Sequence, residues 1–139
     1  MVVSVYNAQD AIAVDTRRMA QVARCAIRQL CIRTAGAFTM TFIDARRMRS
    51  LNRRFLHRDR TTDVLSFRYD GEPVVGEMLI SPRAARVYAK THGLSYQQEL
   101  ARYVIHGLLH WMGHEDRTRL EQRRMRAMED QLLRRCSVT

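Results

Sequence analysis

The sequence is poor in cysteine, in lysine and in long apolar runs. Its cysteines, Cys25, Cys31 and Cys136, are odd in number and form no C-x-x-C pair. This pattern argues against a disulfide framework and a cysteine zinc site, so we expect reduced thiols. The chain has no apolar stretch long enough to cross a bilayer and no charged-then-apolar leader at its start. We therefore expect a soluble, cytoplasmic protein with no membrane partner.

Basic residues are abundant, although Lys90 is the only lysine among the 24 of them. Against 14 acidic residues they give a formal net charge of +10. A positive field of this size attracts a polyanion such as RNA or DNA. A coding bias towards arginine, with the side chains solvated on helix exteriors, explains the same composition without any ligand. Both interpretations stay open at this point.

The periodicity of the apolar residues predicts one α+β domain over residues 1–139, because the chain suits one core and has no repeat or linker. Apolar residues alternate in some segments and recur every three or four positions in others. We expect strands near 2–6, 38–43, 62–67 and 74–81. Helices are expected after the caps Asp15, Asp44, Ser81, Ser95 and Thr118. Met48, Leu51 and Phe55 should form the inward face of the second helix.

The most informative segment lies on the fourth predicted helix and just beyond it. His106 and His110 are four residues apart, so their imidazoles project from the same helix face and are able to bind one transition metal. Gly113 permits the left-handed backbone that ends a helix. Three further possible ligands follow this turn: His114, Glu115 and Asp116. A structural zinc site would have four protein ligands, whereas three leave a position for chemistry.

Gly107 separates this motif from the zincin motif H-E-x-x-H, in which a glutamate follows the first histidine. Without that general base, peptide hydrolysis is disfavoured. A glycine inside a helix costs about 1 kcal/mol relative to alanine. Its presence suggests either a backbone or substrate passing close to the helix, or tight packing of the helix itself.

Residues 46–60 form the densest positive segment that precedes this motif. Guanidinium groups bind phosphate oxygens well, so the segment is a candidate phosphate-binding region. The alternative is a solvated helix face followed by a flexible loop. The candidate phosphate-binding residues are Arg53, Arg54, Arg58 and Arg60.

Several motifs together resemble the YbeY family of bacterial metal-dependent endoribonucleases, which mature and quality-check ribosomal RNA. They are Asn52, Thr62-Asp-Val-Leu-Ser-Phe67, Gly76-Glu-Met-Leu-Ile-Ser81 and His106-Gly-Leu-Leu-His110-x-x-Gly113, in the family's order and spacing. The resemblance covers essentially the whole chain. It implies a mixed four-stranded sheet packed with about five helices, and a metal at the mouth of a positively charged cleft. It also implies single-stranded RNA, ribosomal RNA and the ribosome as partners, without a small organic cofactor.

The chain departs from the family pattern in two places. The family motif resembles His-Gly-x-Leu-His-x-x-Gly-Tyr-Asp-His, and a gapless match puts Asp116 at the third ligand and His114 at the tyrosine. We expect Asp116 to be the third ligand because its spacing matches, with His114 as the rival. A family arginine implicated in catalysis is replaced by Leu56. Arg54, Arg58 or Arg60 are possible substitutes, and the catalytic residues stay unassigned.

The resulting hypothesis is a single-strand-specific endoribonuclease for ribosomal RNA 3′-end maturation and ribosome quality control. One zinc ion, or another divalent metal, held by His106, His110 and Asp116 would polarise a phosphodiester oxygen or lower the pKa of a water molecule. Two alternatives stay open. One is a ribosome-associated or RNA-binding protein with a structural metal and weak or lost nuclease activity. The other is a metal-dependent hydrolase of another substrate class.

Overall fold

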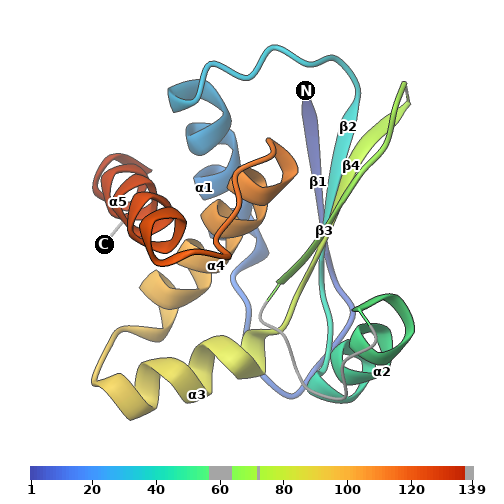
Figure 1. Ribbon diagram of the computed structural model, residues 1–139. Coiled ribbons are helices and arrows are strands. Elements are labelled where there is room, and N and C mark those ends of the chain that lie inside the picture. Colours follow the sequence, from blue (N-terminus) through green and yellow to red (C-terminus); the bar gives the residue numbers. More distant parts are fainter. Residues whose placement is uncertain (57–63, 72, 137–139) are drawn as a thin grey trace.

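Four strands form one mixed sheet with helices on both of its sides (Figure 1). The computed structural model describes residues 1–56, 64–71 and 73–136. The strand order is β1-β2-β4-β3, with β1, β2 and β4 parallel and β3 antiparallel to β4 at one edge. This confirms the sheet that the family resemblance implied. The strands are β1 (Val2–Asn7), β2 (Ala37–Phe42), β3 (Val64–Arg68) and β4 (Val74–Ile80).

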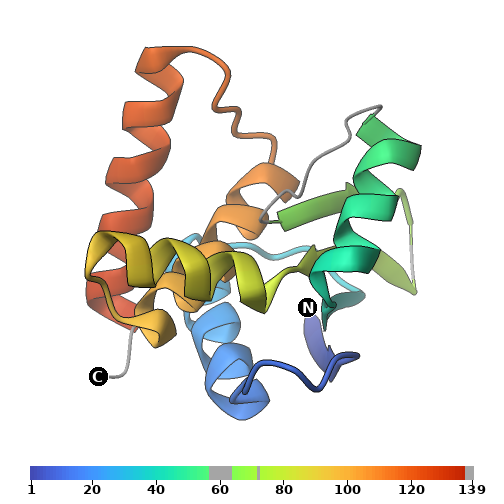
Figure 2. The ribbon, with the colours of Figure 1, turned by 90° about the horizontal axis from the view of Figure 1, so that it is seen from below.

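Five helices occur in the described part of the chain. In Figure 1 helices α1, α4 and α5 lie on one side of the sheet, α2 lies on the other, and α3 runs across the lower end. Seen from below in Figure 2, β3 lies between α4 and α2. None of these described helices has both the length and the apolar character needed to span a bilayer. The helices are α1 (Thr16–Gln29), α2 (Ala45–Leu56), α3 (Pro82–His92), α4 (Tyr96–Trp111) and α5 (Arg119–Cys136).

The five predicted helix caps are confirmed, because each side-chain oxygen accepts a hydrogen bond from a backbone N–H in the first turn. Asp15 accepts from Arg18 N at 3.0 Å, and Asp44 accepts from Arg47 N at 2.7 Å. The same contact is made by Ser81, Ser95 and Thr118 in α3, α4 and α5.

The two faces of the sheet carry two separate cores. Phe38, Met40 and Phe42 of β2 are fully buried in the larger core, to which α1 and α4 contribute their buried apolar faces. The smaller core lies under α2, where Met48 is fully buried as predicted. The inward placement of Phe55 was wrong, since it is 51% exposed. It lies at the margin of this core, where its ring packs edge-on against Phe67 with centroids 5.6 Å apart.

The cysteine prediction was wrong for two of the three residues. Cys25 in α1 and Cys136 at the end of α5 form a disulfide, with their Cα atoms 5.6 Å apart. Cys31 is free, as expected, and it is exposed. The two bonded cysteines are 111 residues apart in the sequence, so their spacing does not indicate that they are paired. It results from the packing of the first helix against the last.

Gly76 of β4 gives room to two aromatic rings. A Cβ atom there would lie 2.5 Å from Trp111 Nε1 and 2.6 Å from the Phe38 ring. These rings pack edge-on at 5.5 Å, and Trp111 Nε1–H donates to Val75 O at 2.9 Å. The absence of a side chain at this position therefore allows the end of α4 to lie against the sheet.

Gly76→Ala should destabilise the fold by about 3 kcal/mol, the upper end for overpacking, because both rings are held by other contacts. Denaturant unfolding monitored by Trp111 fluorescence measures this loss. Gly71→Ala is the control: Gly71 has φ +84° but nothing within 4 Å of an added Cβ. It should cost only about 1 kcal/mol of backbone strain. Equal losses in the two variants would contradict the packing role of Gly76.

Candidate metal centre

Helix α4 brings the histidine pair close to the sheet edge. A Cβ atom on Gly107 would overlap Met78 Sδ and lie 2.9 Å from Val64 Cγ1. The Ser66 hydroxyl donates to Gly107 O at 2.8 Å, which joins β3 to the same turn of the helix. Of the two explanations for Gly107, tight helix packing is therefore confirmed.

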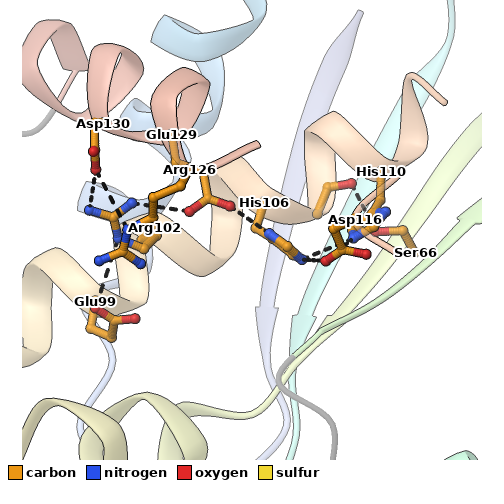
Figure 3. A network of polar contacts seen from close by, with 10 residues as sticks. Ser66, Glu99, Arg102, His106, His110, Asp116, Arg126, Glu129 and Asp130 are labelled. Carbon is orange, nitrogen blue, oxygen red and sulfur yellow. Dashed lines mark hydrogen bonds and ion pairs between the residues drawn. The ribbon is translucent and has the colours of Figure 1, made fainter. Parts of the chain in front are cut away.

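Three predicted ligands converge beside this turn (Figure 3). His106 Nε2 and His110 Nε2 are 2.9 Å apart. Asp116 Oδ2 lies 3.5 Å from His106 Nε2 and 3.4 Å from His110 Nε2. The three side chains are 26%, 30% and 37% exposed, so the group opens to solvent.

The separations of these atoms fit a shared divalent cation. Four ligands arranged tetrahedrally at about 2.0–2.1 Å from zinc are about 3.3 Å from one another. The three observed separations, 2.9, 3.4 and 3.5 Å, lie around that value. Two imidazole nitrogens and one carboxylate oxygen are also ordinary zinc ligands. The residues present therefore fit such an ion.

Asp116 is delivered by a tight turn between α4 and α5. Gly113 has φ +105°, and the N–H groups of Gly113 and His114 donate to carbonyls of the last helical turn, His110 O and Leu109 O. Two residues after Asp116, Thr118 caps the start of α5. Helix ends thus fix the turn on both sides.

The start of α5 is a reciprocal capping box. Thr118 N donates to Glu121 Oε1 at 2.9 Å, and Glu121 N donates to Thr118 Oγ1 at 3.1 Å. The hydrogen bonds from the backbone and side chain of Thr118 hold the pKa of the Glu121 carboxyl below its ordinary value. Because this pKa is depressed in the folded state, the stabilisation is present near neutral pH and is lost as the pH falls through the folded pKa.

His114, the rival ligand, is exposed and lies outside the group formed by His106, His110 and Asp116. Glu115 is also exposed, and its carboxylate lies 3.5 Å from Arg117 Nε. Among the described residues, the side chain that lies beside the two imidazoles is therefore Asp116, the residue that the gapless match placed at the third ligand position.

The candidate phosphate-binding arginines are only partly described. Arg53 and Arg54 are exposed in the last turn of α2, and the Arg54 guanidinium lies 5.8 Å from the Phe55 ring centroid. Arg58 and Arg60 lie outside the described residues. A cavity of about 230 Å³ adjoins His106 and Asp116, and the described arginines that line it do not belong to α2. They are Arg102 of α4 and Arg126 of α5.

Sequence reasoning missed the charged groups behind His106. Glu129 of α5 is buried, and its two oxygens contact His106 Nδ1 at 2.6 Å and Arg102 at 3.0 Å. Arg102 also donates to Asp130 at 2.7 Å. Burial lowers the pKa of Arg102, but its hydrogen bonds to Asp130 and Glu129 outweigh this effect and raise it, so the group stays charged. The available signal was an acid at position 129 on the apolar stripe that contains Met125 and Leu132.

Comparisons with known proteins agree with the motifs. A family model described as "Endoribonuclease YbeY" matches residues 4–137. The chain is similar to endoribonuclease YbeY of Pelotomaculum thermopropionicum, at 33% identity over 100% of this chain and 99% of that protein. It is 38% identical to endoribonuclease YbeY of Myxococcus xanthus, over 68% of this chain and 35% of that longer protein. The solution structure of TM1509 from Thermotoga maritima has a similar fold, with a TM-score of 0.63, 20% identity and coverage of 95% and 89% of the two chains.

Proposed function

Because the chain belongs to the endoribonuclease YbeY family, we propose that it is a metal-dependent endoribonuclease that cleaves single-stranded RNA. We place its action in ribosomal RNA 3′-end maturation and ribosome quality control, in the cytoplasm. The observation that carries the proposal is the convergence of His106, His110 and Asp116 on one partly exposed point. The formal charge of +10 supports a polyanionic substrate.

We assign His106, His110 and Asp116 as the ligands of one divalent cation, with zinc as the expected ion. When bound, such an ion acts as a Lewis acid towards a phosphodiester oxygen. Asp116 offers a carboxylate where the family motif has a histidine, so the site carries one negative charge more than a three-histidine site. This charge shifts the metal preference towards harder ions such as Mn²⁺.

The arginines near the ligands would hold the RNA backbone. Arg126 lines the cavity beside His106 and Asp116, while Arg53 and Arg54 belong to the helix on the other side of β3 (Figure 2). Arg102 also lines this cavity, but its guanidinium is held by Glu129 and Asp130. Guanidinium groups bind phosphate oxygens and stabilise charge that develops on them. A single strand fits this task because its backbone bends into a narrow site more easily than a duplex does.

The test is incubation of the purified protein with a labelled single-stranded RNA and with the matching duplex. We expect cleavage of the single strand that stops with chelator and returns when Zn²⁺ or Mn²⁺ is added. Tight binding without cleavage would favour an RNA-binding protein with a structural metal, the alternative that the Leu56 and Asp116 departures leave open. Indifference to RNA would favour a hydrolase of another substrate class.

A further inference from the structure

The second ring nitrogen of His106 faces a buried carboxylate. Glu129 Oε2 lies 2.6 Å from His106 Nδ1, on the side of the ring opposite to the ligand atom Nε2. Figure 3 shows the imidazole between Glu129 on one side and His110 with Asp116 on the other. A carboxylate only accepts hydrogen bonds, so the proton of the neutral imidazole is on Nδ1. The lone pair of Nε2 then points to the other two ligands.

Glu129 is itself held in place. Its side chain is 5% exposed, and its other oxygen accepts a hydrogen bond from Arg102 NH1 at 3.0 Å. Arg102 is fixed in turn by Asp130, one residue further along α5, at 2.7 Å. The contacts with Arg102 therefore hold the Glu129 carboxylate in place against His106.

We propose that Glu129 is a positioning residue of the metal centre, which orients His106 and fixes its Nδ1–H tautomer. The inference rests on the proposed function only in requiring that the site binds a divalent cation. Outer carboxylates of this kind typically change metal affinity 10–100-fold. The centre then consists of two helices and a turn: α4 supplies two ligands, the turn supplies Asp116, and α5 supplies the orienting group.

The experiment compares Glu129→Gln with Asp130→Asn by chelator competition for Zn²⁺ and Co²⁺. Both variants remove one carboxylate charge from Arg102, but only Glu129 touches His106. We expect the metal dissociation constant to rise 10–100-fold in Glu129→Gln and less than about threefold in Asp130→Asn. Equal losses in the two variants, or none in Glu129→Gln, would overturn the inference.

A second readout separates orientation from general stability. Long-range ¹H–¹⁵N spectra of the metal-free protein report the tautomer of His106, and we expect the Nδ1–H form in the wild type. The Nε2–H form should gain population in Glu129→Gln. The melting temperatures of Glu129→Gln and Asp130→Asn are compared as the control for a general loss of stability. A wild-type His106 in the Nε2–H form would refute the role of Glu129 even if the variant fails to fold. Failure of the wild type to bind any divalent metal would instead overturn the proposed function itself.

Discussion

His110→Ala should reduce the bound metal from about one ion per chain to almost none and slow RNA cleavage by more than about a hundredfold. Loss of an outer-shell partner alone costs 10–100-fold, and His110 supplies one of the three ligand atoms that converge in the described part of the chain. The remaining pair, His106 Nε2 and Asp116 Oδ2, 3.5 Å apart, would leave two coordination positions to solvent. Elemental analysis after dialysis measures the metal, and single-turnover cleavage of a labelled RNA measures the rate.

Variants of the two residues that compete for the third ligand position sharpen this result. His114→Ala should keep metal and activity, because His114 is exposed and outside the ligand group. Asp116→Ala should lose both, and Asp116→His should retain or strengthen zinc binding because it restores the family ligand. A full complement of metal in His110→Ala would refute the ligand assignment. Loss in His114→Ala with none in Asp116→Ala would transfer the role to His114.

The sequence predicted the local parts of this centre because helix geometry is local. A spacing of four residues on an amphipathic helix places His106 and His110 on one face, whatever the rest of the fold does. Gly113 and the capping box at Thr118 also lie within a few residues of Asp116. The left-handed backbone at Gly113 and the hydrogen bonds of the capping box both occur as expected. The sheet order required more, because strand partners are far apart in sequence. It followed from the family resemblance and not from periodicity.

Groups that meet only through packing of distant segments were missed. Glu129 lies 23 residues from His106, and its place on the apolar stripe of α5 indicates burial without identifying a partner on α4. The wrong prediction that Phe55 points inward has the same cause, because the helical spacing of apolar residues does not show where the core under α2 ends. Arg102 was hidden among many arginines. Its low exposure and its acidic partners on α5 distinguish it from a solvated side chain.

Reduction of the Cys25–Cys136 disulfide should lower the free energy of unfolding by about 4–5 kcal/mol and the melting temperature by roughly 10–15 °C. The bond joins residues 111 positions apart, so it closes a long loop and removes much of the entropy of the unfolded chain. It also fixes the end of α5, the helix that contains Glu129. Reduction should therefore weaken metal binding as well as stability.

Differential scanning fluorimetry with and without dithiothreitol, on metal-free protein, measures the stability change. Cys25→Ser should show the lower melting temperature under both conditions, because only one of the bonded sulfurs remains. Cys31→Ser is the matched control, since Cys31 is exposed and unbonded, and it should respond to the reductant as the wild type does. A wild-type melting temperature that is indifferent to reductant and equal to that of Cys25→Ser would mean that α1 and α5 are held by packing alone. In that case the buried contacts of Met125 and Leu132 on α5 would be sufficient to keep Glu129 against His106.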